Sequence, residues 1–146
     1  MVTVPNPPTA AAASTIPNVR TFAGVPESVS QARAWAASFL PGSPAAGDVA
    51  LLTSELVTNA ITHQAGGSIM VAVSCCLGEL RVDVYDTARA WPALVSAPAE
   101  AEAGRGLLLV AALSTSWGVS RTPTGKAVYF TLAPRPDLAG GAGRGP

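Results

Sequence analysis

Residues 55–63 read ELVTNAITH, and this segment carries more information on architecture and function than any other part of the chain. At about 100° per residue it continues a helical stripe with Leu52 and Leu56, while Glu55 and Asn59 lie together on the flank. A half-buried carboxylate and carboxamide one turn apart could hold a metal ion and activate a hydroxyl. The simpler interpretation is a solvated helix edge, because short patterns of this kind often arise by coincidence.

Alternation and helical spacing predict the remaining elements. The expected strands are 19–23, 68–76, 80–86, 117–121 and 126–132, and the expected helices are 28–40, 49–63 and 106–113. We expect Asp48 to cap the second helix and a tight turn at Gly78-Glu79. The order β-α-α-β-β-α-β-β predicts an α/β (α+β) two-layer sandwich. Its mixed but mostly antiparallel sheet would have about five strands, with three helices on one face.

Composition limits the class of protein. The length fits one domain, which we place at 19–132 between two segments rich in Pro, Ala, Thr or Gly, 1–18 and 133–146, that we predict to be disordered. A formal net charge of +0 gives no electrostatic argument for nucleic acid or an anionic membrane as a partner. The chain has no apolar run long enough for a bilayer and no recognisable signal peptide, so we expect a cytoplasmic protein.

Asp86 ends a strand whose inward-facing positions are Leu80, Val82 and Val84. Because alternate residues share a face, its carboxylate should point to the side that the helices cover. A buried carboxylate needs hydrogen-bond donors, and an adenine amino group would supply one. The more common interpretation of such an aspartate is a cap on the turn that follows the strand.

Two glycine-containing segments complete the set of signals. Gly104-Arg105-Gly106-Leu107 is expected to open a helix after the long connection 87–104, where small residues would let an anion reach free N–H groups. The simpler interpretation is a flexible hinge. Gly125-Lys126 ends the closing turn and holds the only lysine of the chain, for which a solvated charge is the simpler interpretation. His63 is expected to be a hydrogen-bonded packing residue rather than a ligand.

In this order and spacing, the four signals resemble the histidine-kinase-like ATPase superfamily, which also contains gyrase B, Hsp90 and MutL. The resemblance covers 19–132, and residues 54–60, SELVTNA, match its most specific motif. Within the superfamily the chain is most similar to the small anti-sigma-factor serine kinases of partner-switching systems and to short actinobacterial ATP-binding regulators.

The resemblance implies a Bergerat-type ATP-binding fold and a role for each site residue. Glu55 would be the general base, Asn59 the Mg²⁺ ligand, and Asp86 the reader of the adenine amino group. Gly104, Arg105, Gly106 and Leu107 would lie under the phosphates, Gly125 and Lys126 near the adenine, and 87–103 would form the lid. The chain departs from the family at Asp86-Thr87-Ala88-Arg89-Ala90, which lacks both glycines of the first glycine motif, and at Lys126-Ala127, where a threonine is common.

The function implied is that of a Mg-ATP-dependent serine/threonine kinase. It would phosphorylate an anti-sigma-factor antagonist protein, with a sigma factor as a second partner, and relatives of this kind commonly form homodimers. The alternative is a non-catalytic module of the same fold that regulates a sigma factor or an antagonist by binding alone.

Overall fold

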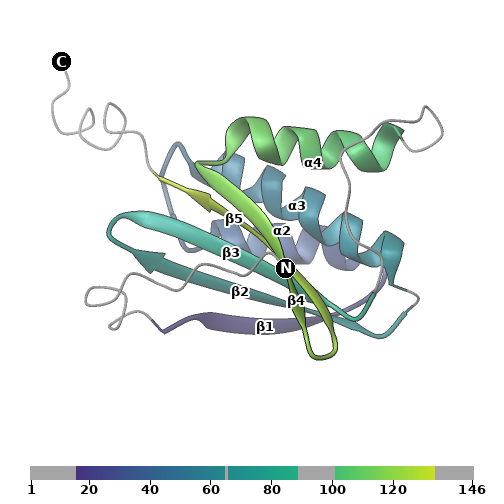
Figure 1. The fold of residues 1–146 in the computed structure, drawn as a ribbon. Coiled ribbons are helices and arrows are strands. Elements are labelled where there is room, and N and C mark those ends of the chain that lie inside the picture. Colours follow the sequence, from purple (N-terminus) through teal and green to yellow (C-terminus); the bar gives the residue numbers. More distant parts are fainter. Residues whose placement is uncertain (1–15, 65, 89–100, 134–146) are drawn as a thin grey trace, which may run out of the picture.

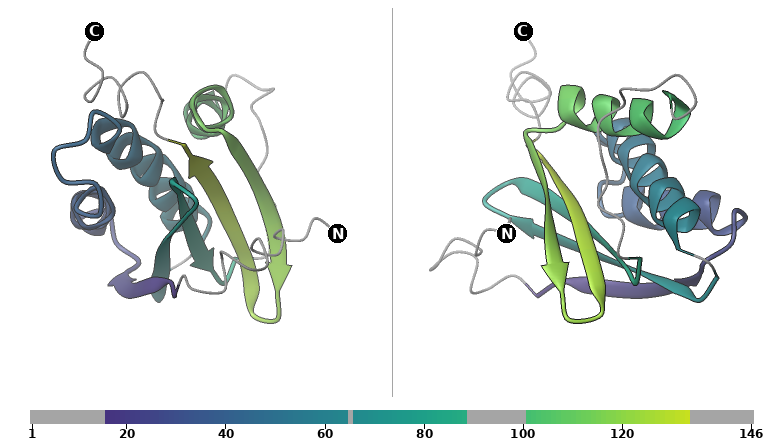
Figure 2. Two further views of the ribbon diagram at one scale, coloured as in Figure 1. Left: turned by 90° about the vertical axis from the view of Figure 1, so that its left-hand side faces the viewer. Right: turned by 45° about the vertical axis from the view of Figure 1, so that its right-hand side comes forward.

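The sheet and the helices form two separate layers in the computed structural model, which describes residues 16–64, 66–88 and 101–133 (Figure 1). The elements are β1 Asn18–Ala23, α2 Ser28–Ala37, α3 Ala46–His63, β2 Ser68–Cys76, β3 Glu79–Asp86, α4 Ala101–Leu113, β4 Ser116–Thr122 and β5 Gly125–Leu132. Both further views show the three helices gathered on one side of the sheet (Figure 2). The predicted element order and the two-layer architecture are confirmed.

The strand order across the described sheet is β1-β2-β3-β5-β4, and every neighbouring pair is antiparallel. The prediction that the sheet is mixed was therefore wrong, and the prediction that it is mostly antiparallel is confirmed. Because β5 lies between β3 and β4, the end of β3 pairs with the start of β5, and Asp86 lies opposite Lys126. This pairing joins two parts of the chain that the sequence separates by the whole of α4 and β4.

The core lies between the sheet and α3, and its residues come from the inward parity of each strand. Val71, Val82 and Phe130 are fully buried, as are Leu52 and Val57 of α3. Removing apolar surface of this kind from water is the main stabilising contribution, at about 25 cal/mol per Å². The alternation used to predict the strands is thus the alternation that fills the core.

The helix boundaries differ from the predicted ones. α3 begins at Ala46, so Asp48 lies in its first turn and the prediction that it caps the helix was wrong. The preceding turn is held instead by Ser43, whose hydroxyl accepts a hydrogen bond from the Ala45 N–H at 3.0 Å. α2 ends at Ala37 rather than at residue 40, and the Ser38 hydroxyl donates to the Trp35 carbonyl there. A side-chain bond of this kind competes with helix continuation.

The third helix starts earlier than predicted. α4 begins at Ala101, so Gly104, Arg105, Gly106 and Leu107 lie inside the helix and do not open it. Alanine and glutamate favour helix strongly, and residues 101–103 are therefore able to extend it ahead of the glycines.

The hairpin between β2 and β3 also differs from the prediction. Its turn residues are Leu77 and Gly78, both with positive φ, rather than Gly78-Glu79. Positive φ at both positions is typical of a two-residue hairpin loop.

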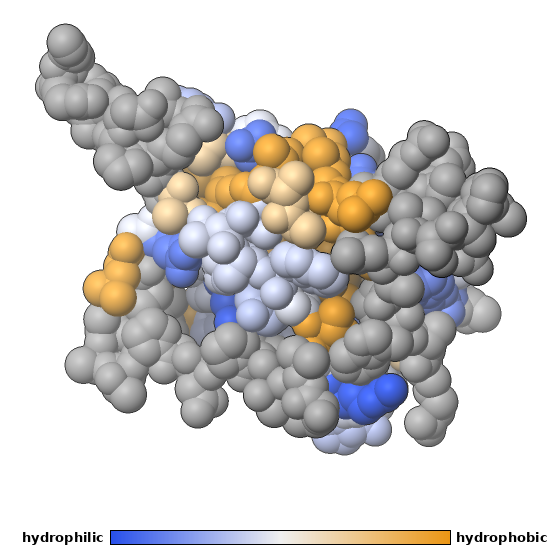
Figure 3. Space-filling model, turned by 45° about the horizontal axis from the view of Figure 1, so that its top comes forward, coloured by the Kyte–Doolittle hydropathy of each residue, from blue (hydrophilic) through white to orange (hydrophobic). Residues whose placement is uncertain are grey.

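The helix layer leaves apolar surface exposed on α4. Leu108 is 43% exposed and Leu113 is 40% exposed, and apolar side chains gather over this helix in the space-filling view (Figure 3).

In the part of the chain that the structure describes, no helix has both the length and the apolar character to cross a membrane. Most of the two segments predicted to be disordered, and residues 89–100 of the predicted lid, lie outside the described residues.

Candidate functional site

The last two turns of α3 carry the polar residues that the sequence singled out. Asn59 is only 6% exposed, so it is buried among the core residues of the helix rather than half-buried at its edge as expected. Its side-chain nitrogen Nδ2 is buried and has no hydrogen-bond partner. Glu55, one turn earlier, is partly exposed. The helix thus presents one accessible carboxylate and one buried, unsatisfied amide on neighbouring turns.

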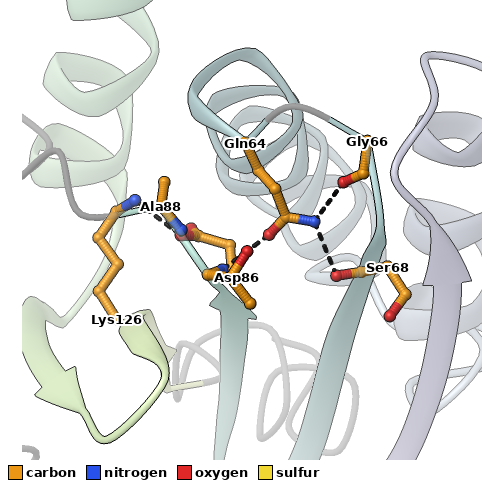
Figure 4. A network of polar contacts seen from close by, with 7 residues as sticks. Gln64, Gly66, Ser68, Asp86, Ala88 and Lys126 are labelled. Atoms are coloured by element: carbon orange, nitrogen blue, oxygen red, sulfur yellow. Dashed lines mark hydrogen bonds and ion pairs between the residues drawn. The ribbon is translucent and has the colours of Figure 1, made fainter.

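Asp86 has the inward orientation that its parity predicts, and it is 4% exposed. Its Oδ1 accepts a hydrogen bond of 2.8 Å from the Ala88 N–H, so the alternative role as a cap on the next turn is also real. The same oxygen accepts from Lys126 Nζ at 2.9 Å (Figure 4). The second oxygen, Oδ2, is buried and has no partner. One oxygen of the carboxylate therefore has protein partners, and the other is buried with none among the described residues.

Lys126 is completely buried, and the interpretation of it as a solvated charge was wrong. In the ion pair with Asp86 the exposed fractions of the two side chains are 0% and 1%. The signal that would have revealed this is parity, because Lys126 shares its face of β5 with Val128 and Phe130, which are both buried. Sequence reasoning placed Lys126 near the site and missed its direct contact with Asp86.

Gly125 allows β5 to start close to the end of β3. A Cβ atom at this position would collide with the backbone oxygen of Asp86 and with Cα of Thr87. Backbone atoms cannot move aside as a flexible side chain can, so only glycine fits without displacing a strand. Gly125 therefore lies against the backbone of Asp86 and Thr87, and its role near an adenine stays a prediction.

Gln64 belongs to the site and was not identified from the sequence. It follows α3 directly, is buried, and donates through Nε2 to the carbonyls of Gly66 at 2.5 Å and Ser68 at 3.0 Å. Its Oε1 accepts from the Thr87 N–H at 2.7 Å (Figure 4). One side chain thus ties the end of α3 to the start of β2 and to the residue after Asp86. It fixes the position of Asp86 relative to the polar face of α3.

His63 does not make the hydrogen bond that was expected of its Nδ1, which is buried without a partner. Burial lowers the pKa of the imidazole below its ordinary value, the Lys126 ammonium lowers this pKa further, and the Asp86 carboxylate opposes both. The ring therefore lies within electrostatic range of the ion pair and favours its neutral form. His63 is better described as part of the site than as a packing residue.

Glu55 meets α4 at Gly106. A Cβ atom at residue 106 would come too close to the Glu55 carboxylate oxygen Oε1, so glycine lets the two helices approach while Glu55 keeps this position. Leu107, the next residue, is buried in the core. The side chain of Arg105 lies outside the described part of the structure, and the roles expected of Gly104 and Arg105 stay predictions. Because these residues are inside α4, the free N–H donors at its start belong to residues 101–104.

Unsatisfied buried atoms converge on this region. Within the described ranges, five buried side-chain atoms lack a hydrogen-bond partner, and three of them are Asn59 Nδ2, His63 Nδ1 and Asp86 Oδ2. Leaving such an atom unpaired costs about 1–3 kcal/mol, so each of the three atoms calls for a polar partner. No group of three or more His, Cys, Asp or Glu that could hold a metal ion occurs among the described residues. A divalent cation here would need oxygen atoms from a bound ligand.

Comparisons with known proteins identify the family of this chain and a solved structure of similar sequence. The model of the histidine kinase-like ATPase domain matches residues 21–132, which is most of the chain. The chain is similar, at 32% sequence identity, to a histidine kinase domain from Erythrobacter litoralis EL346 blue-light activated histidine kinase. That likeness covers 64% of this chain and 46% of that chain, with a TM-score of 0.48, so this chain spans less than half of the solved one. None of the curated proteins compared with this chain matches it.

Proposed function

This chain belongs to the histidine kinase-like ATPase domain family, and on that premise we propose that it is an ATP-binding regulatory protein that phosphorylates a serine or threonine on a partner. The partner proposed is an anti-sigma-factor antagonist, and a sigma factor is the second proposed partner. The observation that carries the proposal is the grouping of unsatisfied buried atoms on Asn59, His63 and Asp86. A bound polar nucleotide would supply hydrogen-bond partners for such atoms.

Asp86 supports recognition of the adenine base. Its free oxygen Oδ2 is an acceptor that is buried and unpartnered, which makes it complementary to the N6 amino group of adenine. Gln64 supports the same role, because its bond to the Thr87 N–H holds the backbone next to Asp86 in place. Binding of the base would remove the cost of the unsatisfied oxygen.

Asn59 supports binding of the phosphates with Mg²⁺. The metal usually takes one or two protein oxygens together with phosphate oxygens, and Asn59 provides an amide in a place where it lacks a partner for Nδ2. A half-turn of the amide exchanges its nitrogen and its oxygen, so the residue fits either a phosphate or the metal. A bound Mg²⁺ would neutralise negative charge on the phosphates.

Glu55 is proposed as the general base. It is partly exposed, one turn from Asn59, so a hydroxyl from a partner protein is able to reach it. The serine oxygen would attack the γ-phosphorus, the bond from that phosphorus to the β,γ-bridging oxygen would break, and Glu55 would take the serine proton. The products are phosphoserine and ADP. The apolar side chains exposed on α4 support a protein rather than a small molecule as the acceptor.

A phosphoryl-transfer assay tests this proposal. Wild-type protein would be incubated with ATP labelled at the γ-phosphate, Mg²⁺ and an antagonist protein that carries the acceptor serine. Glu55→Ala is expected to reduce the transfer rate by at least about 100-fold, since general bases contribute 10²–10⁴. The matched control is Glu27→Ala, an exposed glutamate at the start of α2. Undiminished transfer by Glu55→Ala would remove Glu55 from the mechanism.

A second function, binding without catalysis, is favoured by one specific contact. Lys126 already occupies Oδ1 of Asp86, and the two glycines of the first glycine motif are absent after Asp86. The side chains that replace the glycines reduce the room for adenine, and the ion pair takes up one of the two oxygens of Asp86. A chain that binds the antagonist or the sigma factor with equal affinity in the presence and absence of Mg-ATP, and transfers no phosphate, would be the non-catalytic module.

A further inference from the structure

We infer that Lys126 is a specificity-determining residue that donates a hydrogen bond from its ammonium group to N1 of adenine, beside the bond from the N6 amino group to Asp86 Oδ2. The inference rests on the proposed function and adds to it a residue that reads the base directly. It assigns a role to a side chain that a structural interpretation would treat only as the counter-ion of Asp86.

The ammonium group of Lys126 has hydrogens that its bond to Asp86 does not use. It carries three hydrogens, and its hydrogen bond in this region is the one to Asp86 Oδ1 at 2.9 Å. Burying an ion pair costs free energy that an apolar pair of the same size would not cost. The pair is completely buried, with exposed fractions of 0% and 1% for the two side chains. A recognition role accounts for keeping two charges at this position.

The two side chains together present the edge that adenine requires. Asp86 Oδ2 is a free acceptor, and the neighbouring Lys126 Nζ is a donor. Adenine offers the complementary pair on its Watson–Crick edge, a donor at N6 next to an acceptor at N1. Guanine offers an acceptor at O6 next to a donor at N1, so it would need the opposite arrangement of the two protein groups.

Among the described residues, His63 is a further titratable group near the pair. Its Nδ1 is buried and unpartnered, and burial together with Lys126 lowers the pKa of the ring. A neutral imidazole does not compete with the ammonium group for Asp86. His63 therefore leaves the edge of the base to the ion pair.

Titration calorimetry of the wild-type full chain with nucleotide analogues tests the inference without any substitution. Replacing N1 by carbon, in 1-deaza-ATP, removes the acceptor for Lys126 and keeps the amino group for Asp86. We expect its affinity to be about tenfold or more below that of ATP, as for a lost hydrogen bond to a charged group. The matched control is 7-deaza-ATP, which leaves the edge intact and should bind within about threefold of ATP.

The possible outcomes distinguish the role of Lys126 from the proposed function on which it rests. Equal affinity for ATP and 1-deaza-ATP would overturn the role of Lys126 while ATP binding stands, and tighter binding of GTP than ATP would overturn it as well. Absence of ATP binding by the folded wild type would contradict the proposed function itself. In Lys126→Met, verified as folded by circular dichroism, the difference between ATP and 1-deaza-ATP should shrink below about threefold. If that difference persists, another residue reads N1.

Discussion

At the scale of single residues, removing one partner of the ion pair between Asp86 and Lys126 should destabilise the fold, because the other charge stays buried without it. Lys126→Met would leave the buried Asp86 carboxylate with the Ala88 N–H as its remaining donor. Breaking a buried pair in this way costs about 3–5 kcal/mol. We expect the free energy of unfolding to fall by that amount, measured by urea denaturation at neutral pH.

The double variant Asp86→Asn/Lys126→Met is the control for this prediction. Removing both charges leaves no uncompensated ion, so the double variant should be more stable than Lys126→Met alone. An ordinary surface substitution changes the free energy of unfolding by up to about 0.5 kcal/mol. If Lys126→Met lies within that range of the wild type, the ion pair is not buried as described.

His63 should make stability depend on pH in a known direction. Because the folded state lowers the pKa of this imidazole below its ordinary value of about 6.5, the unfolded chain takes up the proton first as pH falls. The contribution to stability is thus complete above about pH 6.5 and is lost as pH falls toward the folded-state pKa. Urea denaturation between pH 7.5 and about 5 measures it. If the free energy of unfolding of His63→Gln depends on pH as steeply as that of the wild type, His63 is not the source of the dependence.

Sequence reasoning identified some of these residues and missed others for physical reasons. Asp86 was found because the alternation of β3 is regular up to its last residue. Lys126 follows the same rule in β5, but its charge favours solvent in most proteins, and the local pattern does not reveal a partner 40 residues away. Gln64 gave no signal, because its three hydrogen bonds depend on strands that approach it only in the folded chain.

At the scale of elements, the contact between α3 and α4 positions the proposed base. Gly106→Ala would place a Cβ atom against the Glu55 carboxylate, whose flexible end is able to move away. Alanine favours helix by about 1 kcal/mol over glycine, so the unfolding free energy should stay the same or rise slightly. Phosphoryl transfer should fall because Glu55 is displaced. The rate from labelled ATP and a urea denaturation curve, measured on the same protein, check both parts.

Gly47→Ala is the matched control, since Gly47 also lies in a helix and a Cβ atom there meets nothing within 4 Å. It should gain similar helix stability with an unchanged transfer rate. An unchanged rate in Gly106→Ala would mean that the position of Glu55 against α4 has no part in the reaction. Loss of stability by several kcal/mol would mean that the carboxylate has no room to move.

Element types were more predictable than element ends. Alternation in β2, β3 and β5 is strong because one face of each strand fills the core. Helix starts depend on a few polar side chains and on neighbouring contacts, and α3 begins with the Ala45 N–H bonded to Ser43 rather than at Asp48. The glycines of α4 suggested a helix start because glycine is a weak helix former, while in the fold Gly106 serves the approach of Glu55.

At the scale of the whole molecule, topology assembles the site from parts that are distant in the sequence. The strand order β3-β5-β4 brings Lys126 to Asp86, and packing of α4 on α3 brings Gly106 to Glu55. The order of elements along the chain does not determine this arrangement. The resemblance to a known superfamily implied the fold class, which is confirmed, but the direct contact between Lys126 and Asp86 was not predicted.

Binding of Mg-ATP is the property on which every proposed role depends, and calorimetric titration of the full chain measures it most directly. The account predicts saturable binding of one nucleotide per chain, with affinity strongly reduced in Asn59→Ala and Asp86→Asn and unchanged in Glu27→Ala. Bound nucleotide at 100 times its Kd should also raise the unfolding free energy by about 2.7 kcal/mol. No detectable binding to the folded wild-type protein, or equal binding by Asn59→Ala and Asp86→Asn, would contradict the account.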